Sequence, residues 1–287
     1  MSHNNSQTLN LLQQIGMDDG YPNYLYAYIV SENNYREVDY SPLPLGTRSD
    51  INLIPEAKLT MVFIVFDRFI DEKYGLVGQK FSEKYDNLGG DSSYDKILKE
   101  LFRIAKLIRN VLIHEPARFS STNTHVEIRH RTDTSRLILK MSHEALSSFY
   151  TAVIMYVRGN LGTGAYFHAV ISTLYATIKH GLETIEDKSG TELNPVDPLG
   201  YTLNLGWRRI LKDPGFSFDP SLRIHIDTSK AYNEKWFGLD YALIHQGKKI
   251  LIPVEALNTG LQISENQLSA WEYQGPFPPF DPVISRN

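Results

Sequence analysis

Apolar residues recur every three or four positions along the middle of the chain. After Pro55, for example, Leu59, Val62, Phe63 and Phe66 follow this spacing. An α-helix turns once every 3.6 residues, so the spacing gathers these side chains on one face and predicts an amphipathic helix. The same pattern predicts helices over four segments: 55–70, 93–115, 144–157 and 165–186.

A different pattern separates the second and third of these helices. Residues 125–131 and 136–141 are short strand-forming runs joined by Thr-Asp-Thr-Ser, which predicts a β-hairpin. After Lys188, glycine, proline and asparagine become frequent, and a turn at Gly247 and Lys248 predicts a second hairpin. Strands are expected outside the helical region in four places: 24–30, 222–226, 241–245 and 250–254.

These elements predict a mainly α fold. Four successive helices interrupted by one hairpin are typical of a four-helix bundle with a small insertion. We therefore divide the chain into three parts. They are an N-terminal extension over residues 1–50, a helical bundle over 51–187 with the hairpin insert at 125–141, and a small, strand-rich α+β appendage over 188–287.

Composition narrows the classes of function. The chain has 287 residues, of which 42% are hydrophobic and 22% charged, as in ordinary globular proteins. It has no cysteine, which excludes a disulfide framework, a thiolate zinc site and a thiol nucleophile. Its net charge of −4 means that an anionic partner must meet a local basic patch. The N-terminus lacks a signal-peptide pattern and no apolar run reaches the roughly 20 residues of a membrane span, so we expect a soluble, cytoplasmic protein without a membrane partner.

The sharpest local signal is the string Arg-Asn-Val-Leu-Ile-His near the end of the second predicted helix. Pro116 ends this helix near His114. Asn110 and His114 are four residues apart and share a helix face, and Arg109 lies about 100° to one side of Asn110. All three side chains can therefore border one groove on a rigid element.

This string resembles the signature of the HEPN superfamily, which is an arginine followed after four to six residues by a histidine, with asparagine favoured after the arginine. The resemblance covers roughly residues 55–187 and implies a HEPN-like four-helix bundle. It also implies a metal-independent endoribonuclease that needs no cofactor and acts as a homodimer. In such a protein the partners are tRNA or other cellular RNA and, in a toxin–antitoxin or phage-defence setting, an antitoxin protein.

The residue types are compatible with that chemistry. RNA carries its own nucleophile, the 2′-hydroxyl, so cleavage needs proton transfer and positive charge against the phosphate. His114 can transfer a proton near neutral pH. Arg109 offers a permanently charged fork that matches phosphate oxygens, and Asn110 can orient the imidazole or the phosphate.

Two other interpretations fit the same residues. In the first, Arg109 pairs with a carboxylate on a neighbouring helix, Asn110 binds backbone, and His114 only caps the helix C-terminus. In the second, the chain is a non-catalytic HEPN-like module that binds a nucleotide, an RNA or a protein. Convergence of the three side chains with those of a symmetry-related copy in an open, basic groove would favour catalysis. A His114 sealed by the hairpin or the C-terminal strands would favour binding.

The predicted hairpin adds a basic cluster. Arginine, lysine and histidine crowd into 16 residues, and a phosphate backbone would be attracted to them in a salt-dependent way. Charged residues on an exposed strand are also common simply as solvated groups that protect an edge. The candidate RNA-binding residues are Arg129, Arg131, Arg136 and Lys140.

The remaining histidines give no metal signature. His168 and His180 are twelve residues apart on the fourth predicted helix, and His225 and His245 lie in predicted strands without a carboxylate at ligand spacing. Glu115 follows His114, but the next residue is a proline, so no zinc-protease motif is formed. We predict no metal site.

Overall fold

The structure is a computed structural model, and the chain divides into two compact units. The first unit comprises Met1–Asp19, Gly46–Arg158 and Ile171–Pro198, and the second comprises Gly20–Leu45, Gly159–Val170 and Leu199–Asn287. Each unit draws on several stretches of chain, so the predicted boundaries at residues 50 and 187 stay a prediction. The structure describes residues 26–31, 34–38, 55–131, 136–158, 164–197, 199–205, 208–212, 216–218, 223–226, 238–258 and 260–273.

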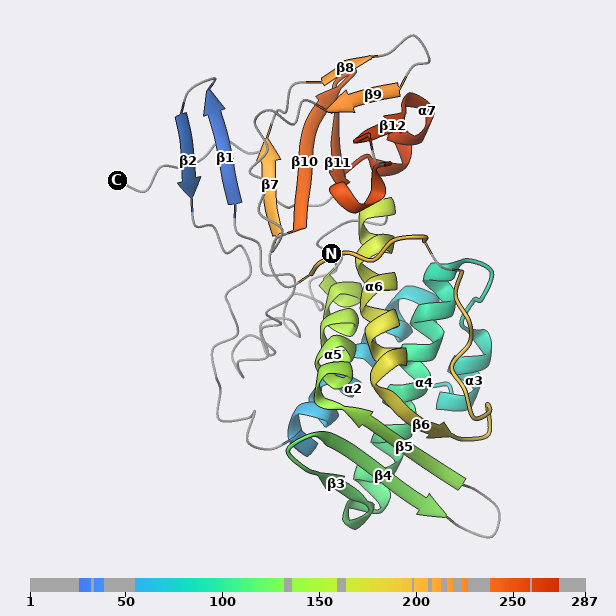
Figure 1. Ribbon diagram of the computed structural model, residues 1–287. Helices are drawn as coiled ribbons and strands as arrows, with labels where there is room; N and C mark the ends of the chain where they lie inside the picture. The colour runs from blue at the N-terminus through green and yellow to red at the C-terminus, as the bar shows by residue number, and fades with distance from the viewer. Residues whose placement is uncertain are drawn as a thin grey trace. The chain divides into compact units, whose positions relative to one another are not determined.

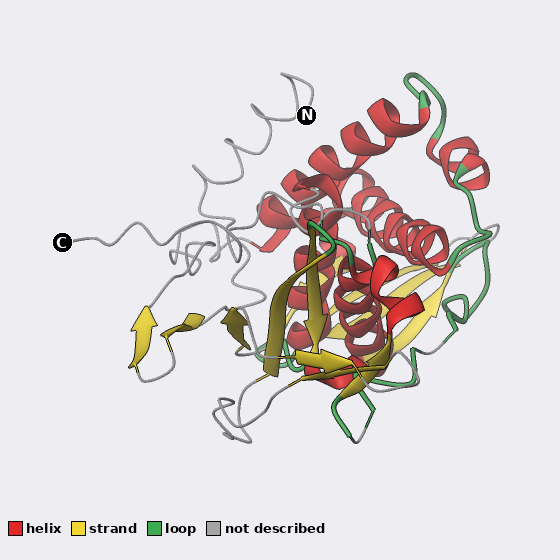
Figure 2. Ribbon diagram, turned by 90° about the horizontal axis from the view of Figure 1, so that it is seen from above, coloured by secondary structure: helices red, strands yellow, loops and turns green. Residues whose placement is uncertain are grey.

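The first unit contains a layer of helices, seen in Figures 1 and 2. The four predicted helices are present, and a short fifth one, Phe81–Asn87, was not predicted. Because its seven residues make only two turns, it carries too little periodicity to be recognised. The bounds are α2 Pro55–Tyr74, α3 Phe81–Asn87, α4 Ser93–His114, α5 His143–Arg158 and α6 Ala165–Gly181, of which the part from Ile171 on belongs to this unit.

Helix α4, which carries the motif, begins and ends as the sequence predicts. The side chain of Ser92 accepts a hydrogen bond from the backbone N–H of Asp95 at 3.1 Å, which satisfies one of the free donors of the first turn. Pro116 follows its C-terminus and opens a single 3-10 turn, Pro116–Arg118. Phe102 of α4 packs edge-on against Phe66 of α2, with ring centroids 6.0 Å apart.

A buried arginine fixes the inner face of α4. Arg103 is only 1% exposed and lies among groups that compensate its charge. Its guanidinium donates to Asp187 at 2.8 Å, to Glu100 at 3.2 Å and to two backbone carbonyls beyond residue 187. A rotation of α4 about its axis would separate Arg103 from these partners and leave a buried charge uncompensated. The cluster therefore fixes which face of α4 points inward.

A four-stranded antiparallel sheet lies across one end of the helices (Figure 1). The predicted hairpin forms its two central strands, and β4 and β5 both contact α4. Along β4, Val126 and Ile128 are buried, as the alternation of the sequence predicts. The connecting residues 132–135 lie outside the described residues. The strands are β3 Phe119–Ser121, β4 His125–Arg131, β5 Arg136–Ser142 and β6 Leu182–Glu186, in the order β3-β4-β5-β6.

Strand β6 corrects the prediction of a helix up to residue 186. Helix α6 ends at Gly181, where a Cβ atom would lie 2.4 Å from Oγ of Ser142 and 2.8 Å from Cβ of Ala145. The chain passes this close contact only with glycine and then pairs with β5, so that Ile185 lies opposite Leu139. A single sequence does not reveal such a contact, because Ser142 lies far away along the chain.

The second unit is built from short strands. Strand β1 covers most of the predicted segment 24–30, and β2 next to it was not predicted. The hairpin turn falls at Gln246 and Gly247, both with positive φ, one residue earlier than expected. Its sheets are β1 Tyr26–Ser31 with β2 Asn34–Val38, then β7 Arg208–Lys212 with β10 Gly238–His245 and β11 Lys248–Pro253, and finally β8 Phe216–Phe218 with β9 Arg223–Ile226 and β12 Gln262–Ser264.

The C-terminal part of the second unit ends in short helical turns. They are the 3-10 turn Val254–Ala256, α7 Glu265–Leu268 and the 3-10 turn Ser269–Trp271. In the same unit, the buried carboxylate of Asp240 in β10 accepts a hydrogen bond from the hydroxyl of Tyr166 at 2.6 Å.

The fold is therefore mixed α and β, and the prediction of a mainly α four-helix bundle was wrong. The four-stranded sheet is a full layer of the first unit and not a small insert, because β3 and β6 extend the hairpin on both sides. No helix in the described part of the chain has the length and apolar character to cross a membrane.

Candidate functional site

The three motif residues lie in the last two turns of α4, where their side chains converge. Nη1 of Arg109 donates a hydrogen bond to Oδ1 of Asn110 at 3.3 Å and lies 3.4 Å from Nε2 of His114. A guanidinium has only donors, so Nε2 is the acceptor in the second contact. Arg109 and Asn110 are half-buried and His114 is exposed. The three motif side chains thus form one polar cluster, and solvent reaches this cluster at His114.

Helix α3 positions the guanidinium of Arg109. The central carbon of this group lies 4.8 Å from the ring centroid of Phe81, within the range of a cation–π contact. Phe81 in turn packs edge-on against Phe63 of α2, with centroids 5.2 Å apart. Sequence reasoning missed Phe81 because the helix that carries it was not predicted.

A buried lysine attaches α3 to α2. Nζ of Lys84 lies 2.7 Å from Asp67 and 2.6 Å from Asp71, and the lysine is 3% exposed. Burial raises the pKa of Asp67 above its usual range, while Lys84 acts in the opposite direction. This ion pair fixes the helix that supports Arg109.

The motif opens into a pocket of about 250 Å³. Helix α4 forms one wall with Asn110 and His114, and the sheet forms the other with His130 of β4 and Leu137 of β5. His114 is not sealed by the sheet. The pocket can therefore admit a solute that reaches Asn110, His114 and His130 together.

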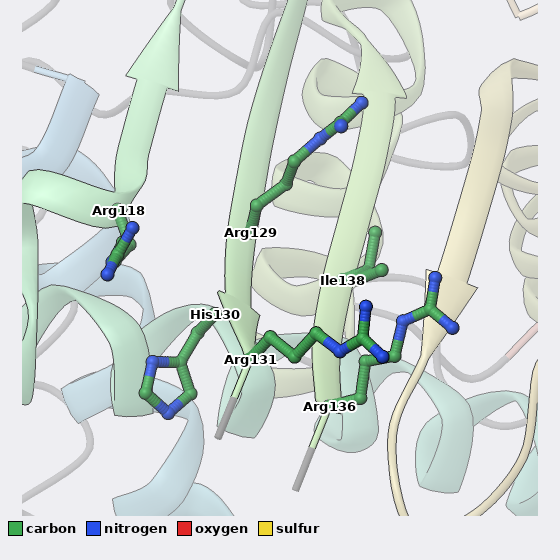
Figure 3. A pocket seen from close by; sticks show the side chains of 6 residues that line it. All are labelled: Arg118, Arg129, His130, Arg131, Arg136 and Ile138. Carbon is green, nitrogen blue, oxygen red and sulfur yellow. The ribbon is translucent and has the colours of Figure 1, made fainter. Parts of the chain in front are cut away.

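A second pocket, of about 280 Å³, is basic and is lined mostly by side chains on the face of the sheet opposite to His130 and Leu137 (Figure 3). In Figure 3, Arg131 and Arg136 lie side by side, whereas the ring of His130 points away from them, toward the side of Arg118. His130 lines both pockets, so the two adjoin each other at this residue. The residues around the basic pocket are Arg118, Arg129, His130, Arg131, Arg136 and Ile138.

The structure brings three of the four candidate RNA-binding residues together. Arg129, Arg131 and Arg136 line the basic pocket, whereas Lys140 does not. Lys140 forms an ion pair with Glu183 of β6.

Carboxylates balance part of the positive charge of the basic pocket. Arg129 pairs with Glu127 of its own strand, and Arg136 lies 3.1 Å from Glu186 of β6. Arg131 forms no ion pair with any carboxylate in the described part of the chain, which makes it the cation that an anion meets without first displacing a partner.

Sequence reasoning gave no role to the ion pairs at the end of α4. Oε2 of Glu115 lies 2.8 Å from Nδ1 of His130 and 3.4 Å from Nε of Arg118. The carboxylate thus links the helix to the sheet at the boundary of the two pockets. His130 reaches Glu115 only because β4 pairs with its neighbouring strands. The spacing of the two residues in the sequence therefore does not predict their contact.

No other histidine in the described part of the chain lines either pocket. His245 lies 3.2 Å from Oε1 of Glu265 in the second unit, and the side chain of His225 is outside the described residues. Among the residues that the structure describes, no group of three or more histidine, aspartate or glutamate side chains is placed to hold a metal ion.

Comparison with known proteins yields no relative: no family model, no curated protein and no solved structure matches the chain. A function is therefore inferred from the residues and their geometry.

Proposed function

We propose that the protein is a metal-independent endoribonuclease of HEPN type. One observation carries the proposal: the side chains of Arg109, Asn110 and His114 converge at the end of a rigid helix, and Asn110 and His114 line a pocket that solvent enters, with Arg109 in contact behind them. Two features count against a purely structural role for the motif. Arg109 forms no ion pair with a described carboxylate, although its charge acts on Asp67 of α2, and the backbone N–H of Glu115 itself bonds the carbonyl of Val111 at the helix end.

The reaction uses the 2′-hydroxyl of the RNA as the nucleophile. His114 accepts the proton of this hydroxyl, and the 2′-oxygen attacks the adjacent phosphorus. The bond from phosphorus to the 5′-oxygen breaks, and that oxygen takes up a proton. The products are a 2′,3′-cyclic phosphate and a free 5′-hydroxyl. Arg109 stabilises the negative charge that builds up on the phosphate oxygens, and Asn110 orients Arg109 through their hydrogen bond.

The basic pocket supports RNA as the substrate. Arg129, Arg131 and Arg136 line a pocket that shares His130 with the motif pocket, although these arginines project from the other face of the sheet. The further parts of the proposal come from the HEPN resemblance. They are a homodimer, action on tRNA or other cellular RNA in the cytoplasm, and a toxin or phage-defence role with an antitoxin as partner.

The non-catalytic alternative keeps one supporting observation. Arg129, Arg136 and Lys140 are already paired with glutamates, as expected of side chains that stabilise the sheet. A module of this kind would bind RNA, a nucleotide or a protein at the same surface without cutting it.

The test is cleavage of labelled RNA by the purified protein in EDTA. We expect the wild type to cut and the variants Arg109→Ala and His114→Ala to lose at least about 100-fold in rate, the usual contribution of a positioned proton-transfer group or charge. Matched controls are Arg68→Ala and His180→Ala, which change exposed residues away from the pocket. RNA that is bound but left intact would support the non-catalytic module, and equal rates in all five proteins would reject the assignment.

A further inference from the structure

We propose that His130, held by Glu115, is a second proton-transfer group of the same site and protonates the leaving 5′-oxygen. This inference rests on the proposed ribonuclease function. It adds a catalytic residue from the sheet, outside the helical motif, and gives a single chain both the base and the acid of the reaction.

The contact with Glu115 defines how the ring of His130 is held. Oε2 of the glutamate lies 2.8 Å from Nδ1, and an ionised carboxylate only accepts hydrogen bonds, so Nδ1 carries a proton. Nε2 is then the nitrogen available to a substrate, and it has no hydrogen-bond partner in the described part of the chain. A carboxylate that fixes one ring nitrogen in this way sets the orientation and tautomer of a working histidine.

Glu115 is itself firmly placed. It directly follows the last residue of α4, and its backbone N–H donates to the carbonyl of Val111 at 2.8 Å. The side chain of His130 is 15% exposed, compared with 41% for Glu115, so the ring is largely packed while one edge reaches the pockets. His130 therefore lies on a strand and Glu115 at the hydrogen-bonded C-cap of α4.

The two histidines differ in what surrounds them. Nε2 of His114 accepts from Arg109, so in this arrangement it is an unprotonated nitrogen with a lone pair. The ring of His130 faces the negative charge of Glu115, which can balance a doubly protonated ring. The carboxylate beside His130 suits this residue as the acid, and His114 acts as the base when the substrate hydroxyl takes the place of Arg109 at Nε2.

The location fits this division of work. His114 and His130 line opposite walls of the motif pocket, one from α4 and one from β4. A phosphodiester between them has its 2′-hydroxyl near His114 and its 5′-oxygen near His130. One proton passes from the 2′-hydroxyl to His114 and one from Nε2 of His130 to the 5′-oxygen, and exchange with water restores both rings.

The alternative is that the Glu115–His130 pair only holds the sheet against α4. The two roles are separated by a substrate whose leaving atom needs no proton. RNA with sulfur in place of the 5′-oxygen at the scissile bond releases a thiolate, which is a good leaving group without an acid. Such a substrate rescues the loss of an acid but does not rescue a distorted site.

The experiment compares His130→Ala and Glu115→Gln with the wild type on both substrates. On ordinary RNA we expect His130→Ala to be about 100-fold slower and Glu115→Gln about tenfold slower. On the sulfur-containing RNA, both should come within a few-fold of the wild type, whereas His114→Ala should stay slow on both. The control His143→Ala removes another histidine that bonds this region, through Nε2 to the carbonyl of Thr122, and should cut both substrates at the wild-type rate.

Three results would overturn the inference: no loss in His130→Ala on either substrate, an equal loss on both substrates, or a wild type that cuts neither RNA. The first two leave the proposed function standing if Arg109→Ala and His114→Ala are inactive, and the third removes the proposed function as well. Thermal melting checks that each variant is folded, and His130→Gln replaces His130→Ala if the latter has no melting transition.

Discussion

At the residue scale, the proposed chemistry of the candidate site depends on three side chains of one helix. Nη1 of Arg109 lies 3.4 Å from Nε2 of His114. The same nitrogen donates a hydrogen bond to Oδ1 of Asn110. In the proposed reaction, the arginine provides a permanent positive charge and the histidine provides the proton transfer. A change at either position therefore removes one function and leaves the helix intact.

A separate residue-scale prediction concerns the stability of the second unit. Burial lowers the pKa of His168 below its usual range, and Nε2 of this ring has no hydrogen-bond partner among the described residues. The unfolded chain then binds a proton more readily than the folded one, so stability is full above about pH 6.5 and falls as the pH decreases below that value. We expect His168→Leu to lose less stability than the wild type between pH 7.5 and 5.5. Urea midpoints at the two pH values measure this, and identical shifts in both proteins would contradict it.

At the element scale, the site is made by a short helix, a long helix and a sheet. The long helix α4 was predictable because its periodicity extends over 22 residues and Pro116 ends it. The short helix α3 and the strand β6 were not, since the first has seven residues and the second depends on the contact of Gly181 with Ser142.

The role of α3 gives a prediction on activity. Phe81→Leu keeps an apolar side chain but removes the aromatic face under the guanidinium of Arg109. A cation–π contact of this kind is worth about 0.5–1 kcal/mol, so we expect the cleavage rate to fall roughly two- to five-fold. Phe81→Tyr retains the ring and should keep the wild-type rate. Single-turnover cleavage measures both, and an equal rate in Phe81→Leu and the wild type would show that the stacking does not matter.

The site itself was predictable only in part, for a physical reason. Arg109, Asn110 and His114 belong to one helix, so their spacing in sequence already fixes their spacing in space. Glu115 and His130 are 15 residues apart and meet only through the packing of the sheet on the helix end. The interpretation of the hairpin as a basic cluster did not reveal that Glu127, Glu183 and Glu186 would pair with three of its cations.

At the scale of the whole molecule, the proposed catalytic group and the basic pocket share His130 on a chain whose net charge is −4. In the proposed function, the attraction of an RNA backbone is therefore local, and it involves the two pockets that share His130. The sheet has a double role in this arrangement, because it forms one wall of the motif pocket and carries the arginines.

Whether this chain uses the RNA's own 2′-hydroxyl is tested most directly by one measurement. A labelled RNA that the wild type cuts in EDTA is compared with the same RNA carrying a 2′-deoxy sugar at the cleaved position, and the product ends are identified by mass spectrometry. We predict that the unmodified RNA yields a 2′,3′-cyclic phosphate and a 5′-hydroxyl, and that the 2′-deoxy RNA is not cut at that position. Cleavage of the 2′-deoxy RNA at the same position, or a product with a 5′-phosphate, would contradict the assignment of Arg109, Asn110 and His114 to this reaction.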